Sequence, residues 1–258
     1  MGTALHIEGL IMADYFEIKR KIDSTDLDLN GVLSVPTTAA FLQYLATARS
    51  IEYGYDRDTF LKNNNAFWVV SKIRMNFKKA VRFSDEILLK TWPLKPGMLI
   101  MPRDYEFVGE NGETMVSATS EWCVLDIDTH RPRRVSSTTI DTSDDYLTLR
   151  TDAGEFSRLK ETVDEADKVY ERKIRSSDID ENLHTNNCVY TRIVMDCFDV
   201  DFLLKNTVKT FEIHFINETR EGDILRLYCK KTDNTYYVEA KCQDKTVVKA
   251  LIEFEENA

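Results

Sequence analysis

The residues with the widest capacity for chemistry lie in one short stretch, from Arg175 to Tyr190. Near neutral pH an imidazole with an ordinary pKa can both accept and donate a proton, and neighbouring carboxylates or amides can fix its tautomer and orientation. Such groups are dense in this stretch: Asp178, Asp180, Asn182, His184, Asn186 and Asn187. The composition predicts an acid–base site in a loop, and an apolar helical pattern follows directly after it.

The same stretch recurs earlier in the chain without its histidine. Residues 21–32 align without gaps with residues 173–184, and Val32 stands where His184 stands. The shared positions are Asp26 with Asp178, Asp28 with Asp180, and Asn30 with Asn182.

A second pair of segments also repeats. Residues 73–77 resemble residues 211–215, and downstream of them Ala80 occupies the place of Glu218. The period is far too long for a solenoid, so we interpret the chain as two fused copies of one domain. Features that both copies share are expected to be structural. His184 and Glu218, which only the second copy has, are therefore the better catalytic candidates.

Length and composition predict an ordinary globular protein. The chain has 258 residues, enough for one large domain or two small ones, and 43% of them are hydrophobic, which suffices for a buried core. No apolar run reaches the roughly 18 to 20 residues of a membrane span, and the segment from Met1 to His6 lacks the charged and apolar regions of a secretory signal. We therefore expect a cytoplasmic protein without a membrane span.

Cysteine usage and charge argue against several kinds of partner. The five cysteines are odd in number and form no Cys-x-x-Cys pair, which favours reduced thiols over a disulfide framework or a zinc site. The net charge of −10 opposes binding to nucleic acid, and no basic stripe with interleaved aromatic residues is present in the sequence. We expect no metal, no cofactor and no nucleic-acid partner.

Each half is predicted to contain one helix followed by strands. Apolar residues at helical spacing are Phe41, Leu42, Leu45 and Ala48 in the first half and Tyr190, Ile193, Val194 and Cys197 in the second. Strand patterns cover residues 67–77, 87–92, 116–124, 237–242 and 248–254, with a hairpin turn from Gly109 to Gly112. This order predicts an α+β fold in which an antiparallel sheet wraps a central helix.

The most specific motif of the chain is Asp180-x-Asn182-x-His184-x-Asn186-Asn187-x-x-Tyr190. It is accompanied in the first half by Trp68-Val-Val-Ser-Lys72, by Ile73 and Met75, and by Glu121-Trp122. On these residues the chain resembles the acyl-ACP thioesterase family, as a bacterial relative of the plant fatty acyl-ACP thioesterases, from about Phe16 to Phe254.

The resemblance implies a tandem double hotdog fold, in which each half is an antiparallel sheet wrapped around a long helix. The expected division is an N-terminal hotdog with the acyl-chain pocket (residues 1–135), a polar linker (136–168), and a C-terminal hotdog with the catalytic residues (169–258). The implied activity is hydrolysis of fatty acyl-ACP thioesters to free fatty acid and holo-ACP. The implied partner is an acyl carrier protein that bears a phosphopantetheine-linked acyl chain.

The active-site residues proposed for the family fall on Asp180, Asn182, His184 and Glu218 of this chain. Plant relatives carry a cysteine directly after the glutamate, where this chain has Thr219, so a cysteine nucleophile is excluded at that position. Water activated by Glu218 or His184 is the remaining nucleophile, and the sequence leaves open which of the two is the base. Asn182 is then expected to donate to the thioester carbonyl, and Asp180 to hold Asn182 and His184 in place.

Other residues of the motif are expected to be structural. Asp178 has a counterpart in Asp26, which predicts a turn, and Asn186 and Asn187 stand where helix N-caps are expected. Tyr190 is expected in the core.

Two further residues have side chains that are capable of chemistry. Cys188 is a possible thiol nucleophile, but its place on an apolar helix favours a small buried side chain. His214 alternates with apolar neighbours, which places it on the polar face of its strand.

Candidates for the acyl-chain pocket are Phe41, Tyr44, Trp68, Trp92 and Met98, which are also ordinary core residues. An acidic carrier protein needs a basic patch on its enzyme, and two clusters can supply one: Lys78, Lys79 and Arg82, or Arg131, Arg133 and Arg134. Because fusion reproduces the dimer of single hotdog domains, we expect a monomer or a homodimer. The alternatives are an acyl-CoA thioesterase or hydratase of hotdog fold, and a non-catalytic acyl-binding module.

Overall fold

The computed structural model describes residues 15–257. The segment from Met1 to His6, which is expected to lack a secretory signal, lies outside the described residues, as does the beginning of the first predicted domain.

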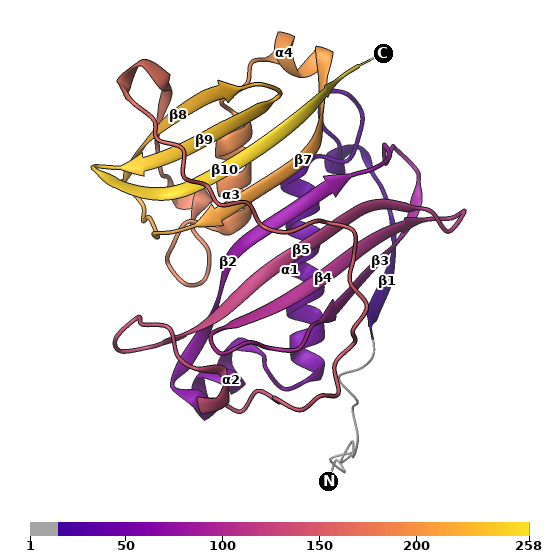
Figure 1. Ribbon diagram of the computed structural model, residues 1–258, viewed down its shortest axis with the longest axis vertical. Helices are drawn as coiled ribbons and strands as arrows, with labels where there is room; N and C mark the ends of the chain where they lie inside the picture. The colour runs from indigo at the N-terminus through magenta and orange to yellow at the C-terminus, as the bar shows by residue number, and fades with distance from the viewer. Residues whose placement is uncertain (1–14, 258) are drawn as a thin grey trace.

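A single antiparallel sheet of ten strands forms the body of the molecule, with the strand order β1-β3-β4-β5-β2-β7-β10-β9-β8-β6 (Figure 1). The first half supplies β1 (Phe16–Lys21), β2 (Ala66–Phe77), β3 (Glu86–Pro93), β4 (Ile100–Gly109) and β5 (Thr114–Asp126). The second half supplies β6 (Lys168–Lys173), β7 (Asn206–Phe215), β8 (Ile224–Thr232), β9 (Thr235–Cys242) and β10 (Lys245–Glu256). The two halves have the same internal order, which confirms the predicted duplication. The predicted strands and the hairpin turn, where Gly112 has a φ of +80°, are confirmed as well.

The two halves join where β2 pairs with β7. Arg74 and Glu212 occupy corresponding positions of the repeat, and they lie directly opposite each other across this joint. Their side chains form an ion pair of 2.6 Å, and the Glu212 side chain is fully buried. A pseudo-two-fold axis therefore passes through the Arg74–Glu212 pair, as expected for two fused copies of one domain.

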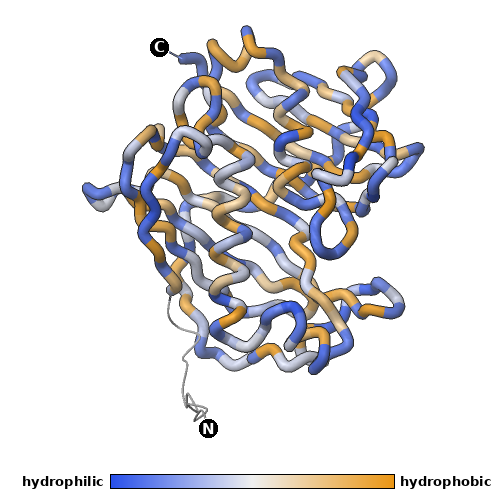
Figure 2. Tube along the Cα trace, turned by 180° about the vertical axis from the view of Figure 1, so that it is seen from behind, coloured by the Kyte–Doolittle hydropathy of each residue, from blue (hydrophilic) through white to orange (hydrophobic). Residues whose placement is uncertain are grey.

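The helices lie together on one face of the sheet (Figures 1 and 2). Helix α1 (Val35–Glu52) is capped by Ser34, and helix α3 (Asn187–Met195) is capped by Asn186, its counterpart in the repeat. The second central helix has 9 residues against 18 in the first, and Cys197, which was expected on its apolar stripe, lies beyond its end. Two shorter helices complete this layer: α2 (Arg57–Asn64) and α4 (Val200–Lys205).

The core fills the space between these helices and the sheet. Helix α1 buries Leu42 and Leu45, α3 buries Ile193 and Val194, and all four belong to one apolar cluster with the inward residues of both halves of the sheet. Figure 2 shows hydrophobic residues along the strands and helices and hydrophilic ones in the peripheral loops. This is the arrangement of a tandem double hotdog, so the predicted fold is confirmed.

The segment between β5 and β6 crosses the opposite face of the sheet, over the joint of the two halves (Figure 1). It contains only two short 3₁₀ helices among the described residues, Val135–Ser137 and Glu165–Asp167. Arg74 Nε donates to the Ala153 carbonyl at 2.7 Å, and the Ser157 N–H donates to Glu212 Oε1 at 2.8 Å. The segment is thus anchored to the pair on the pseudo-two-fold axis.

Within residues 15–257 no helix is long and apolar enough to cross a membrane. In the same range the cysteines are free thiols, and no cluster of three or more histidine, cysteine, aspartate or glutamate side chains is placed to hold a metal ion.

Candidate functional site

The loop that carries the motif is built on a buried aspartate. Asp178 ends a 3₁₀ turn (Ser176–Asp178), is 3% exposed, and accepts hydrogen bonds from Arg172 Nη2 at 2.6 Å and from the Arg175 N–H at 2.9 Å. In the first half Asp26 accepts from Arg20 Nη2 at 3.2 Å in the same way. The prediction that Asp178 is structural is confirmed.

Asp180 shapes the next turn. Its Oδ1 accepts from the Asn182 N–H at 2.8 Å, and its own N–H donates to the His184 carbonyl at 2.9 Å. The turn forces Leu183 to a φ of +61°, where the first half has Gly31 at +68°. A side chain in this region costs about 1 kcal/mol or more. Asp180 therefore acts on the backbone of Asn182 and His184, and within the described part of the chain its carboxylate does not bond to the amide or the imidazole of these residues.

His184 and Glu218 come together as the sequence predicts. The distance from His184 Nε2 to Glu218 Oε2 is 3.0 Å, and the side chains are 18% and 43% exposed. Glu218 lies in the loop between β7 and β8, three residues beyond the end of β7 at Phe215. Val32 and Ala80 occupy the two corresponding positions of the first half, so that half lacks the pair.

Arg220 competes for the same imidazole nitrogen, because its Nη2 lies 3.4 Å from His184 Nε2. A guanidinium can only donate, so this contact requires a lone pair on Nε2, whereas the contact with the Glu218 carboxylate requires a proton there. The carboxylate contact is shorter and assisted by charge, which favours a proton on Nε2. With the proton on Nε2, the lone pair of the neutral ring lies on Nδ1, and none of residues 15–257 donates to it.

A buried hydroxyl cluster ties the Glu218 loop to the start of α3. Thr219 is 1% exposed, and its Oγ1 lies 2.8 Å from Thr185 Oγ1 and 2.7 Å from Tyr190 Oη. The Thr219 carbonyl also accepts from the Thr185 N–H at 2.9 Å. These contacts fix the position of Glu218 relative to His184. The hydroxyl of Thr219 is therefore a structural group, and Tyr190 is a core residue as predicted.

Asn182 makes its side-chain contact with the other half of the molecule. Arg57 Nε, at the start of α2, donates to Asn182 Oδ1 at 3.1 Å. Because a guanidinium has no acceptor, the amide must present its oxygen to Arg57, and its two N–H donors point elsewhere. Sequence reasoning missed this residue, because Arg57 lies outside both repeated segments and the contact spans 125 positions of the chain.

A small cavity reaches the start of α3 from the inside of the first half. Its volume is about 10 Å³, close to that of a single water site. Its lining residues are Ala39, Leu42, Gln43, Val70, Ile73, Tyr105, Ser120, Trp122, Asn187 and Cys188. An acyl chain can enter this cavity only if side chains move. Asn187 and Cys188, which follow His184 closely, connect the cavity to the motif.

Cys188 is a buried thiol. Its Sγ donates to Gln43 Oε1 at 3.4 Å, and burial raises the pKa of the thiol to about 11. At neutral pH it is therefore protonated and a poor nucleophile. His214 binds Glu212 Oε1 at 2.7 Å on the side of the sheet that the linker covers, so it too is structural.

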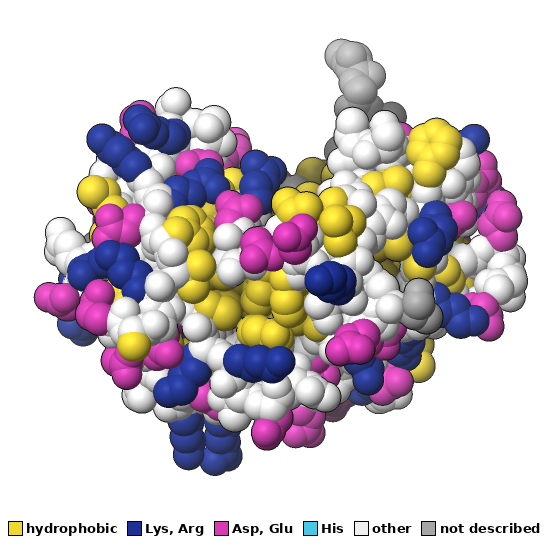
Figure 3. Space-filling view, turned by 90° about the horizontal axis from the view of Figure 1, so that it is seen from above, with side chains coloured by type: hydrophobic (Ala, Val, Ile, Leu, Met, Phe, Trp, Pro, Cys, Tyr) yellow, Lys and Arg dark blue, Asp and Glu magenta, His cyan; other side chains and the backbone are white. Residues whose placement is uncertain are grey.

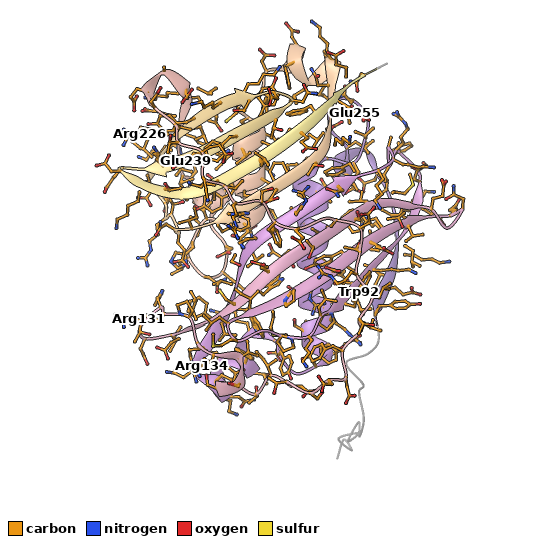
Figure 4. The ribbon with its side chains drawn as sticks, in the orientation of Figure 1. Trp92, Arg131, Arg134, Arg226, Glu239 and Glu255 are labelled. Carbon is orange, nitrogen blue, oxygen red and sulfur yellow. The ribbon has the colours of Figure 1, made fainter. Side chains whose placement is uncertain are left out.

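The structure does not bring the five candidates for the acyl pocket together. Tyr44 and Met98 are 56% and 64% exposed, whereas Phe41 packs on Phe107 and Trp68 packs on Phe60. The remaining candidate, Trp92, is buried on the linker side of the sheet, where its Nε1 donates to the Leu149 carbonyl at 3.0 Å (Figure 4). None of the five lines the cavity at the start of α3. The residues that do line it carry weak sequence signals, since Tyr105, Ser120 and Gln43 stand in ordinary amphipathic patterns.

The fold and the site together define a tandem double hotdog protein in which one of two repeat-related positions carries a histidine–glutamate pair. The chain belongs to the acyl-ACP thioesterase family. Residues 13–142 match the N-terminal domain of that family, and residues 161–256 match its C-terminal domain.

Curated relatives include chloroplastic plant proteins. Oleoyl-acyl carrier protein thioesterase 2 of Arabidopsis thaliana is 24% identical over 236 residues, which are 84% of this chain and 64% of the relative. Palmitoyl-acyl carrier protein thioesterase of the same plant is 24% identical over 230 residues, 85% of this chain and 55% of the relative. The chain thus spans less than two thirds of the length of these relatives.

Solved structures share the fold over nearly the whole chain. An acyl-ACP thioesterase from Bacteroides thetaiotaomicron superposes with a TM-score of 0.85 at 22% identity, over 93% of this chain and 98% of that one. The 12:0-ACP thioesterase from Umbellularia californica superposes with a TM-score of 0.80 at 16% identity, over 94% and 98% of the two chains.

Proposed function

We propose that this protein hydrolyses fatty acyl-ACP thioesters to free fatty acid and holo-ACP. The observation that carries the proposal is the His184–Glu218 pair, which one half of the duplication has and the other half lacks. Membership of the acyl-ACP thioesterase family supports the substrate class. A general base positioned on water contributes about 10²- to 10⁴-fold to such a reaction.

His184 is the base in this proposal, and Glu218 is its positioning residue. Glu218 accepts a hydrogen bond from the protonated Nε2 of His184 at 3.0 Å, which leaves Nδ1 to take a proton from water. The water oxygen bonds to the thioester carbon, and negative charge develops on the carbonyl oxygen. When the carbon–sulfur bond breaks, the imidazolium returns the proton to the departing thiolate, which is already a good leaving group.

Asn182 is the proposed donor to the developing oxyanion. Arg57 holds the amide oxygen, so the amide N–H groups are available to a substrate oxygen. The positive end of the α3 dipole adds to the same stabilisation, since α3 begins three residues after His184. Asp180 supports both groups through the backbone turn that it closes.

The acyl carrier protein is proposed to dock on the loop after β5. Arg131 and Arg134 are exposed there, on a loop that Arg133 ties to the Asn64 carbonyl of α2, the helix that begins with Arg57 (Figure 4). The competing cluster, Lys78, Lys79 and Arg82, lies beside Val32 and Ala80, in the half that lacks the histidine–glutamate pair. A basic patch beside the site would steer an acidic carrier toward it. The free thiols support a cytoplasmic location, and the fused halves support a monomer or a homodimer.

The test measures free-thiol release from acyl carrier protein thioesters of graded chain length, beside matched CoA thioesters. The proposal predicts that carrier-protein thioesters are hydrolysed faster than CoA thioesters. The Arg131→Glu/Arg134→Glu variant should have a higher KM for the carrier-protein substrates, and their turnover should depend more steeply on salt than that of CoA thioesters. A preference for CoA would reassign the substrate to an acyl-CoA hydrolase. Acyl binding without turnover on either series would make the protein a binding module.

A further inference from the structure

A second and much larger cavity opens at the end of the molecule that carries α4 and the C-terminus. Its volume is about 550 Å³, within the range of about 300 to 1,000 Å³ typical of small-molecule sites. Figure 3 looks onto this end and shows hydrophobic side chains gathered in a hollow, with cationic and anionic side chains around it. The apolar residues that line the cavity include Val35, Phe77, Val116, Met195, Leu203 and Val208.

This cavity is the repeat-related counterpart of the catalytic site. Val32, Ala80 and Arg82 line it, and they correspond to His184, Glu218 and Arg220. The backbone is conserved between the two positions, since the Leu33 N–H donates to the Val81 carbonyl at 2.8 Å as Thr185 does to Thr219. The scaffold of a site is therefore present without a general base.

The unequal helices explain why this position is open. Met195 ends α3 and corresponds to Gln43, but α1 continues beyond Gln43 to Glu52. After Met195 the chain turns into α4, and Leu203 of α4 forms the far wall of the cavity. The volume is thus a consequence of the shortened helix.

Positive charge is concentrated on one wall. Lys78, Lys79 and Arg82 come from a single segment and all line the cavity, where Arg82 lies close enough to Asp28 for its charge to act on that carboxylate. The partners of Lys78 and Lys79 are solvent-exposed carboxylates, which contribute only about 0 to 1 kcal/mol each and can be exchanged for another anion.

Two carboxylates also line the cavity. Asp28 uses one oxygen to accept the Asn30 N–H at 2.8 Å, and Glu255 lies on β10 near the C-terminus (Figure 4). Burial raises the pKa of Asp28, and its backbone hydrogen bonds and the Arg82 charge partly offset that effect, so a guest carboxylate competes with Asp28 for Arg82.

We propose that this cavity binds a free long-chain carboxylate, with the apolar chain between Phe77, Leu203 and Val208 and the carboxylate against Arg82. The proposal rests on the proposed function, because this ligand is the acid that the reaction releases. A thioester at this position would not be hydrolysed, since no imidazole or carboxylate stands at Val32 or Ala80.

The experiment is a calorimetric titration with dodecanoate as the probe. The proteins are wild type, the active-site variant His184→Ala, the charge-reversed variant Arg82→Glu and the cavity-filling variant Ala80→Trp. Lys245→Glu is the matched control, because this exposed cation lies at the opposite end of β10 from Glu255. Thermal unfolding of every variant confirms that it folds. Dodecanol tests the contribution of the head group.

We expect His184→Ala and Lys245→Glu to bind dodecanoate as wild type does. Arg82→Glu should weaken binding roughly tenfold, as should replacement of dodecanoate by dodecanol, because each removes a charged hydrogen bond. Ala80→Trp should also weaken it. Binding that is lost in His184→Ala, or unchanged in both Arg82→Glu and Ala80→Trp, would overturn the proposal. The titration contains no thioester, so its result does not depend on whether the protein hydrolyses acyl carrier protein substrates.

Discussion

Two positions of this molecule have the same backbone and different chemistry. At one, His184 and Glu218 lie 3.0 Å apart beside a nearly closed cavity of about 10 Å³. At the other, Val32 and Ala80 border a cavity of about 550 Å³. The buried aspartates, the turns and the helix caps are common to both. The comparison teaches that the duplicated scaffold only positions groups, and that the catalytic capacity depends on a few side chains and on the length of one helix.

The largest expected effect separates the two members of the histidine–glutamate pair. His184→Ala should lower kcat by about 10²- to 10⁴-fold, because it removes the general base. Glu218→Gln should cost about tenfold, since a glutamine oxygen still accepts the Nε2 proton but carries no charge. Steady-state thiol release measures both.

The control is Glu110→Gln, which removes the charge of an exposed glutamate in the hairpin turn between β4 and β5 and should leave kcat unchanged. Equal losses for His184→Ala and Glu218→Gln would show that Glu218 is itself the base.

The contact between the halves at the site gives the second prediction. Asn182→Ala should lower kcat by about 10²- to 10³-fold, as expected for an oxyanion donor. Arg57→Ala should lower it by about tenfold, because Arg57 acts only through the orientation of the amide. In the double variant Arg57→Ala/Asn182→Ala, kcat should equal that of Asn182→Ala alone. An additive loss of kcat would contradict the positioning role of Arg57.

The joint of the two halves should depend on its buried ion pair. Arg74→Met removes the guanidinium from the buried Glu212 carboxylate, which keeps only Ser157 and His214 as partners, and this should cost about 3 kcal/mol in chemical denaturation. Burial raises the pKa of Glu212, but hydrogen bonds from His214 and Arg74 outweigh it and lower the pKa below its ordinary value.

The sign of the pH effect follows from this lowered pKa. The stabilisation is complete above the ordinary glutamate pKa of about 4.3 and is lost as pH falls further, through the lowered pKa of the folded state. In Glu212→Gln this part of the acid destabilisation should disappear. Identical acid unfolding curves for wild type and Glu212→Gln would contradict the assignment.

The smallest effect is expected at Cys188. Cys188→Ala should change kcat by less than about twofold, because a buried thiol with a raised pKa of about 11 is no nucleophile at neutral pH. Modification by an alkylating reagent at pH 7 should be slow and is followed by mass spectrometry. Loss of turnover in Cys188→Ala with unchanged folding would restore the thiol as a candidate.

The sequence predicted what depends on local pattern. The strands, the hairpin turn, the cap of α3 and the role of Asp178 all follow from alternation, turn residues and the repeat itself. Because both halves share a register, the pairing of His184 with Glu218 was also predictable.

Contacts between the halves were not predictable in this way. Arg57 meets Asn182 only because the two copies pack with a pseudo-two-fold axis, and no local pattern records that packing. Trp92 is apolar and lies in a strand, but its face of the sheet is covered by the linker rather than by helices, so hydrophobicity alone misplaced it. The early end of α3 at Met195 depends on the turn into α4, and the apolar spacing continues past it to Cys197.

The most direct test of the account is a crystal structure of the protein with an acyl carrier protein that bears a non-hydrolysable dodecyl thioether. The account predicts that the thioether sulfur lies against the His184–Glu218 pair, with Asn182 directed at the adjacent carbon and the carrier protein on Arg131 and Arg134. A sulfur bound beside Val32 and Ala80 would contradict it, because the thioester would then reach the half of the molecule that has no base.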